Sequence, residues 1–182
     1  MNKFIGKFLA AIGVISFRAE VNASDYLDLG AMLSNGNTKV MEDLTLFQTD
    51  RKKYFKLHEE ELLQRGIESP DEISPAITLI DSLKSIKKVV YADYKEDAGD
   101  VLKRLESLAN GKLKQGGSYV NLVAHMKEKT TANGISNYLE NSDAQYLFSC
   151  VTEAKYKLVM IDEESDAYPL LLVPLEQFEQ VK

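Results

Sequence analysis

Two short acidic segments carry the side chains that are best suited to chemistry in this sequence. The first lies within KVVYADYKEDAGD, and the second is the bend DEESDAY between two apolar stretches. Together they supply the carboxylates and tyrosines of Asp93, Tyr94, Glu96, Asp97, Asp162, Glu163, Glu164, Asp166 and Tyr168. Converging carboxylates bind Mg²⁺ or Ca²⁺ through oxygen ligands, or dock a basic protein surface. Either chemistry requires the two segments to meet in the fold.

Taken singly, each acidic residue has an ordinary structural role. Asp97 suits the N-cap of a helix, Asp166 suits an Asx turn, and the other carboxylates are typical solvated charges. The bend also lacks the D-x-[DN]-x-[DN]-G spacing of a calcium loop. We therefore predict that the set forms a protein-binding face and holds no metal. The alternative is a metal-dependent enzyme that uses the carboxylates of Asp93, Asp97, Asp162 and Asp166.

The two histidines and the single cysteine add no catalytic pattern. His58 lies in LHEEEL, but an H-E-x-x-H zinc motif needs a second histidine where this chain has Leu62. His125 has no identifiable acid or nucleophile beside it, so we expect a polar or partly buried helix position. Cys150 follows apolar residues, which favours a buried thiol. P-loop, nucleophile-elbow and Rossmann glycine patterns are absent, and we predict no catalytic residue and no cofactor.

The elements that position the acidic segments are predicted in the middle and at the end of the chain. Residues 89–94 are β-branched and aromatic, which is typical of a strand, and a helix capped near Glu96 or Asp97 follows. Residues 156–162 and the run YPLLLVP form a predicted hairpin around EESDA. The two acidic segments meet if the first strand lies beside this hairpin.

Helices are predicted for most of the remaining chain. One begins at Ser24 and ends near Asn35, and a second covers 39–47. A third runs from Thr49 or Asp50 to Gly66, with an apolar stripe of Tyr54, Leu57, Leu62 and Leu63. A further helix has Pro75 in its first turn. Two more cover SYVNLVAHMKEK and ISNYLENSDAQYLFSCVTEA, the second with a break near 141–142, and a final helix begins at LEQF. The predicted fold class is α+β, with several helices packed on a small mixed or antiparallel sheet and a C-terminal β-hairpin.

Four segments together resemble a known family. They read YFKLHEEELLQRGI, ITLIDSLK, VVYADYKEDAGDVLKRLESL and YKLVMIDEESDAYPLLLVPLEQF, and they cover roughly residues 50–178. Their order resembles an uncharacterised bacterial family, domain of unknown function six-six-three-zero. Two positions depart from the family pattern, because Pro75-Ala76 replace an aromatic residue and Tyr94 replaces tryptophan. The resemblance implies an intracellular bacterial α+β domain with no assigned activity, and it supplies no catalytic residues.

Composition and charge narrow the class of protein. The chain has 182 residues, 45% hydrophobic and 27% charged, which favours a single globular domain over 1–182. The net charge of −6 repels phosphate backbones, so we predict no nucleic-acid partner. The one cysteine excludes an intramolecular disulfide and fits a reducing compartment. The glycine-rich stretch at 111–118 is predicted to be a flexible internal loop.

The N-terminal segment 1–23 has two interpretations. Three of its features are typical of a signal peptide: Lys3 and Lys7 come first, an apolar run follows at 8–17, and Val21-Asn22-Ala23 resembles a cleavage site. However, the run is short, and Arg18 and Glu20 separate it from that cleavage site. We favour an amphipathic N-terminal helix and a cytoplasmic location, with export as the alternative. The run is too short to span a bilayer, so we predict no stable membrane insertion.

These observations favour a non-catalytic protein-binding module. The specific hypothesis is a bacterial immunity protein that neutralises a cognate toxin, with a basic toxin domain docked on the acidic segments. Small size, net negative charge and the absence of catalytic patterns motivate this hypothesis. A regulatory or scaffold module needs the same kind of surface, so it stays an alternative. The sequence specifies neither the partner nor the oligomeric state.

Overall fold

The computed structural model describes residues 16–17, 23–129, 134–163 and 165–179. Their contacts group into two compact units, one formed by residues 23–88 and the other by residues 16–17 with 89–179. The organisation of 1–182 as one domain stays a prediction. None of the helices in the described ranges is long and apolar enough to cross a bilayer.

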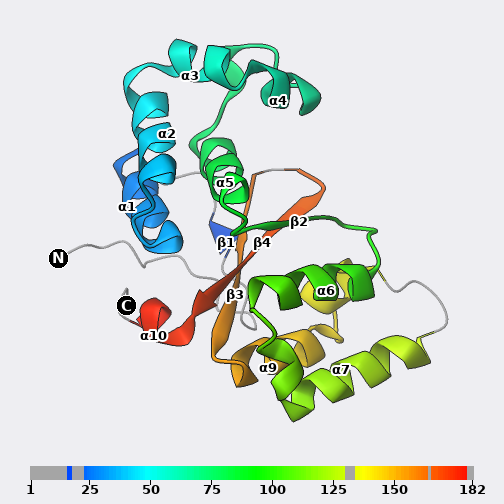
Figure 1. The fold of residues 1–182 in the computed structure, drawn as a ribbon. Coiled ribbons are helices and arrows are strands. Elements are labelled where there is room, and N and C mark those ends of the chain that lie inside the picture. Colours follow the sequence, from blue (N-terminus) through cyan, green and yellow to red (C-terminus); the bar gives the residue numbers. More distant parts are fainter. Residues whose placement is uncertain (1–15, 18–22, 130–133, 164, 180–182) are drawn as a thin grey trace. The chain divides into compact units, whose positions relative to one another are not determined.

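The unit 23–88 is helical. Its elements are α1 (Ala23–Ser34), α2 (Thr38–Thr49), α3 (Arg51–Leu57), α4 (Glu59–Gln64), the 3₁₀ helix η1 (Pro70–Glu72) and α5 (Pro75–Ser85). Side-chain caps begin three of them: Asn37 accepts the Lys39 N–H at 3.1 Å, Asp50 accepts the Lys53 N–H at 3.0 Å, and Ser74 accepts the Ile77 N–H at 3.2 Å. Helix α2 packs against both α1 and α5 (Figure 1).

The long helix predicted from residue 49 or 50 to Gly66 is broken at His58. Helix α3 ends at Leu57 and α4 begins at Glu59. Tyr54 of α3 and Leu62 of α4, on the two sides of this break, are both buried in one core cluster. The predicted apolar stripe is therefore wrong at two positions, since Leu57 is 66% exposed and Leu63 is 50% exposed.

The second unit contains a four-stranded sheet with the order β1-β3-β4-β2. Its strands are β1 (Ser16–Phe17), β2 (Val90–Asp93), β3 (Tyr156–Ile161) and β4 (Ala167–Pro174). Strands β3 and β4 form the predicted C-terminal hairpin, β2 pairs antiparallel with β4, and β1 pairs parallel with β3. The sheet is therefore mixed, and β2 lies at one edge of it (Figure 1).

Helices cover one face of this sheet. They are α6 (Ala98–Leu108), η2 (Leu113–Gln115), α7 (Gly117–Glu128), α8 (Ser136–Leu139) and α9 (Ala144–Glu153). The last helix, α10 (Leu175–Glu179), follows β4 and contacts both β3 and β4. Alternate strand residues share a core cluster with α6 to α9, among them Val90, Ala92, Leu158 and Leu170. The predicted α+β class, with helices packed on a small sheet, is confirmed. The predicted break near 141–142 is also confirmed, because α8 ends at Leu139 and α9 begins at Ala144.

Two predicted segments coincide only partly with described residues. The N-terminal helix over 1–23 lies outside them except at three positions, and there Ser16–Phe17 form strand β1 while Ala23 begins α1. The loop predicted at 111–118 contains η2 and the first residues of α7, and the side chain of Leu113 is buried. Its flexibility stays a prediction.

Candidate functional site

The two acidic segments meet at one end of the sheet. Asp93, the last residue of β2, pairs with Ala167 at the start of β4. One residue further, the Tyr94 N–H donates to the Asp166 carbonyl at 3.2 Å. The condition on which the binding-face prediction depends is therefore met. We call this set the acidic patch, and it consists of Asp93, Tyr94, Glu96, Asp97, Asp162, Glu163 and Asp166.

A hydrogen-bond network fixes the hairpin loop beside β2. The Tyr91 hydroxyl donates to the carboxylate of Glu163, which also accepts the Ser165 hydroxyl at 3.0 Å. Ser165 in turn accepts the Ala167 N–H at 3.2 Å. Glu163 is half-buried, so its carboxylate helps to hold the loop as well as contributing charge. The loop is thus attached to β2 by side chains as well as by the β ladder.

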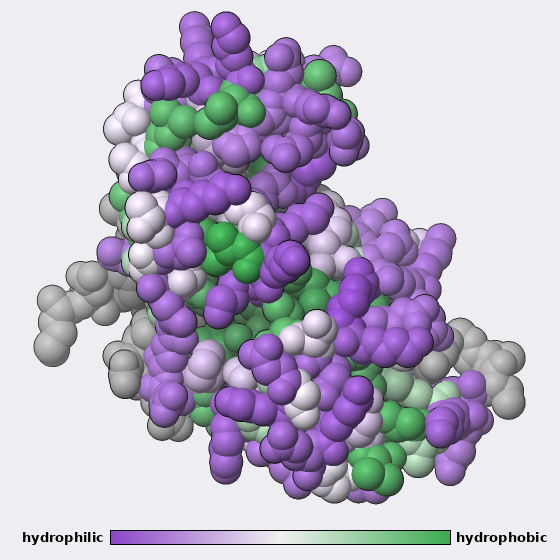
Figure 2. Space-filling view, in the orientation of Figure 1, coloured by the Kyte–Doolittle hydropathy of each residue, from purple (hydrophilic) through white to green (hydrophobic). Residues whose placement is uncertain are grey.

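The members of the predicted site differ in their exposure. Asp93, Tyr94, Asp97 and Asp166 are exposed, whereas Glu96, Asp162 and Glu163 are half-buried. Glu164 lies outside the described residues. Hydrophilic residues cover the region around the connection between β2 and α6, right of centre in Figure 2. The exposed part of the patch is therefore a polar surface that a partner can reach.

Tyr168 was predicted in the binding face, but the structure places it in the core. It is 9% exposed and packs in the cluster between the sheet and the helices. Its hydroxyl donates to the Glu140 carboxylate at 2.7 Å. Burial, together with that hydrogen bond, raises the pKa of Tyr168. Alternate strand residues point to opposite faces, and this alternation directs Tyr168 inward.

Arg104 and Lys95 contact members of the acidic patch. Arg104 Nη2 is 2.5 Å from Glu96 Oε1, and Lys95 Nζ lies 4.8 Å from the centre of the Tyr94 ring. The aspartates and glutamates still outnumber these cations, so the patch keeps a negative charge. Such a patch attracts basic partners and speeds their association.

Two carboxylates of the acidic patch accept backbone N–H groups. Asp97 caps α6, as predicted, by accepting the N–H groups of Gly99 at 2.9 Å and Asp100 at 3.2 Å. Asp93 accepts the Lys95 N–H at 2.8 Å. Within the described ranges, no three Asp, Glu, His or Cys side chains are grouped closely enough to hold a metal ion.

Comparison with known proteins agrees with the resemblance noted in the sequence. The family model for DUF6630, a domain of unknown function, matches residues 25–182. The chain belongs to this family. No curated protein and no solved structure matches it. Membership in DUF6630 assigns no activity, so the function has to be argued from the site.

Sequence reasoning missed one residue at the patch of this DUF6630 chain. Arg104 projects from α6, and besides its ion pair with Glu96 its Nη1 donates to the Tyr91 carbonyl at 3.0 Å. A lone arginine in the middle of an amphipathic helix gives no sequence signal. The one available indication was the spacing of eight residues between Glu96 and Arg104, which lets a residue before the helix meet its second turn.

Sequence reasoning also missed the acid beside His125. Asp143 Oδ1 lies 3.2 Å from His125 Nε2, and Lys129 donates to the other oxygen of the same carboxylate. The hydrogen bond from Lys129 is the main reason that the pKa of Asp143 is lowered. The His125 ring stacks on Tyr146 with 4.0 Å between ring centres. Asp143 immediately precedes α9, so this cluster attaches the end of α7 to the start of α9.

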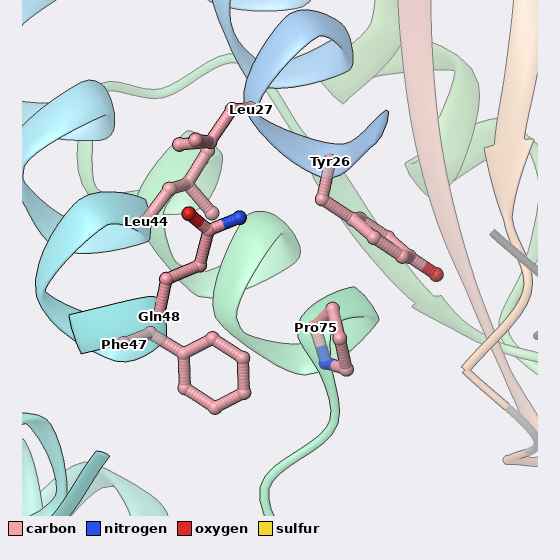
Figure 3. A pocket seen from close by; sticks show the side chains of 6 residues that line it. All are labelled: Tyr26, Leu27, Leu44, Phe47, Gln48 and Pro75. Atoms are coloured by element: carbon pink, nitrogen blue, oxygen red, sulfur yellow. The ribbon is translucent and has the colours of Figure 1, made fainter. Parts of the chain in front are cut away.

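One pocket of the helical unit is too small for a substrate. This pocket lies between α1, α2 and the start of α5, and Figure 3 shows its lining of Tyr26, Leu27, Leu44, Phe47, Gln48 and Pro75. Its volume is about 10 Å³, which accommodates at most a single water molecule. His58 lies elsewhere in this unit, 3.3 Å from Glu61 and 3.7 Å from Asp43, with its ring against Tyr54. These contacts are typical of a structural histidine.

Proposed function

We propose that this DUF6630 chain is a non-catalytic protein-binding module that docks a basic partner on its acidic patch. The observation that carries the proposal is the pairing of β2 with β4, which brings Asp93 and Tyr94 beside Asp166 and Ala167. An exposed aromatic residue among carboxylates is a common composition for a protein interface. The more specific proposal is a cytoplasmic immunity protein whose partner is a basic toxin domain.

The carboxylates have the distribution that recognition of a basic surface requires. Asp93, Asp97 and Asp166 are exposed, so their charges are available for long-range attraction. Glu96 and Glu163 are held by Arg104 and Tyr91, so they are fixed in position before a partner arrives. A prearranged surface loses less side-chain entropy on binding than a mobile one does. The patch combines accessible charge with a rigid support.

The immunity proposal is tested by co-expression with a toxin encoded beside the gene. Wild-type protein should protect cells from the toxin, and a variant with Asp93→Lys and Asp166→Lys should not. Glu128→Lys with Glu176→Lys is the matched control, because it makes the same change of net charge at exposed positions of the same unit. Full protection by the patch variant would contradict the proposal. Binding of the patch to a partner that is not a toxin would support the regulatory or scaffold alternative.

Calorimetry tests the metal-dependent alternative separately. Titration with Mg²⁺, Mn²⁺ and Ca²⁺ should give no heat of specific binding if the carboxylates serve only as caps and docking charges. Micromolar binding that Asp166→Asn abolishes would support a metal site instead.

A further inference from the structure

Among the residues that the structure describes, no strand covers one side of β2. It is the last strand in the order β1-β3-β4-β2, and within those residues β4 is its strand partner. The bond between the Tyr94 N–H and the Asp166 carbonyl sets which residues face β4. In an antiparallel ladder, residues whose backbone groups bond the neighbouring strand alternate with residues whose backbone groups point away from it. Val90 and Ala92 therefore direct their backbone groups toward β4, and Tyr91 and Asp93 direct theirs to the open side.

Internal groups occupy the two carbonyls on this open side. Arg104 Nη1 donates to the Tyr91 carbonyl at 3.0 Å, and the Glu96 N–H donates to the Asp93 carbonyl at 3.0 Å. The Arg104 side chain is 42% exposed and is also paired with Glu96 at 2.5 Å. It is therefore anchored by polar contacts at a partly solvated site, from which a competing donor can displace it.

Arg104 makes the same two interactions that a basic strand would make at this position. Its N–H occupies the place of a neighbouring strand's backbone donor, and its positive charge pairs with a carboxylate of the acidic patch. Edge strands are commonly protected by charged side chains, and they are also used to bind extended peptides by strand addition. The negative charge of the patch decides which extended segment would fit.

We propose that the partner adds an extended segment with alternating basic side chains to the open side of β2, and that this segment displaces Arg104. This inference rests on the proposed function, since it describes how a basic partner engages the acidic patch. Tyr91 and Asp93 lie on the same face of the sheet. Every second side chain of the added segment points to that face, and one of them lies opposite Asp93. A lysine or arginine there forms a cross-strand pair with that carboxylate.

The test uses two acetylated, fluorescently labelled peptides in which lysine alternates with valine. In the second peptide, alternate backbone nitrogens are methylated on the edge that would pair, which removes hydrogen-bond donors but keeps every charge and side chain. Anisotropy titrations with the full chain should show that methylation weakens binding about tenfold, the equivalent of one or two backbone hydrogen bonds. Equal affinity for the two peptides, or no binding of either, would overturn the inference.

Arg104→Ala should bind the unmethylated peptide more tightly than wild type, because the open side of β2 no longer has an internal competitor. Lys95→Ala is the matched control, since it removes a neighbouring positive charge but leaves the Tyr91 carbonyl bonded to Arg104. A gain with Arg104→Ala that exceeds the gain with Lys95→Ala supports displacement. Equal gains in affinity for the two variants would mean that the loss of a positive charge alone strengthens binding, which contradicts the displacement of Arg104 by the added segment.

Amide hydrogen exchange gives a readout at the strand itself. The exchange of the Asp93 N–H, which points to the open side, should slow with the unmethylated peptide. Unchanged exchange at saturation would contradict strand addition while leaving the acidic patch as a docking surface. The proposed function fails by a different result, namely a native partner that still binds after charge reversal at Asp93 and Asp166.

Discussion

The carboxylate of Glu153 accepts the backbone N–H of Ser118 at 2.8 Å, although 35 residues separate them in the sequence. It also accepts the Gly117 N–H at 3.2 Å, so a residue of α9 caps the first turn of α7. The N-terminal N–H groups of a helix lack partners within the helix and favour a negative charge. The hydrogen bond to Ser118 is accordingly the main reason that the pKa of Glu153 is lowered.

Replacing Glu153 with glutamine should lower the thermal unfolding midpoint at neutral pH. The carboxylate's folded pKa lies below its usual value of 4.5, so its stabilising contribution is present above that pH and is lost as the pH falls through the folded value. The difference between wild type and Glu153→Gln should therefore be largest near pH 7 and shrink in acid. Thermal melts followed by circular dichroism, from acid to neutral pH, measure this difference in midpoint.

The control for this prediction is Glu42→Gln, which removes an exposed carboxylate from the middle of α2. A Glu153→Gln midpoint that follows wild type at every pH would show that the cap adds no stability.

Gly30 lies where helix α1 packs closely against α2. A Cβ at this position would lie 2.2 Å from Leu44 Cδ1. Alanine gains roughly 1 kcal/mol of helix propensity over glycine, whereas overpacking a core costs about 1–3 kcal/mol. Gly30→Ala should therefore lower the urea midpoint of unfolding. Gly117→Ala is the control, because a Cβ there meets no other atom within 4 Å. Equal stability of Gly30→Ala and wild type would contradict the packing argument.

Glu106 is a buried carboxylate with few compensating contacts. Its residue is 5% exposed, neither side-chain oxygen has a hydrogen-bond partner, and Lys114 Nζ is 3.9 Å away. Apolar replacements of poorly compensated buried charges are often stabilising, and we expect Glu106→Met to raise the free energy of unfolding by about 1–3 kcal/mol. Urea denaturation at neutral pH measures this change.

A double-mutant cycle with Lys114→Met checks the cause. Lys114→Met alone should destabilise the protein, because it leaves the buried carboxylate without its ion pair. In the Glu106→Met background the same change should have little effect. A Glu106→Met variant that is less stable than wild type would show that the carboxylate is better compensated than these distances imply.

Cys150 should be chemically inert in the folded protein. Its side chain is buried at 1% exposure, and burial raises the pKa of the thiol to about 12, with the charges of Glu106 and Glu153 adding to the effect. Since the thiolate is the reactive form, alkylation at pH 8 should be slow without denaturant and fast in urea. Mass spectrometry follows the labelling. Rapid labelling of the native chain would contradict this account.

Local patterns in the sequence predict the elements of this fold well. The β-branched run at 89–94, the apolar runs on either side of EESDA, the helix with Pro75 in its first turn and the cap at Asp97 all depend on neighbouring residues, and the structure contains each element. Once β2 is placed beside the hairpin, the meeting of the two acidic segments follows from strand register.

Features that depend on distant contacts are not visible in such patterns. Periodicity alone predicts one helix through His58 and assigns Leu57 and Leu63 to the core, whereas the helix breaks at His58 and both leucines are exposed. The contacts of Arg104 with Tyr91, and of His125 with Asp143, join residues 13 or more positions apart. No local pattern specifies those pairings, so the residues that complete the acidic patch appear only in the folded chain.

The most direct test of the central claim is affinity purification of the tagged full-length chain from its own cells, with mass spectrometry of the bound proteins. Wild type and the Glu128→Lys, Glu176→Lys control should recover the same basic partner, and the Asp93→Lys, Asp166→Lys variant should lose it while remaining folded. A partner retained by all three proteins, or no partner recovered by wild type, would contradict docking on the acidic patch.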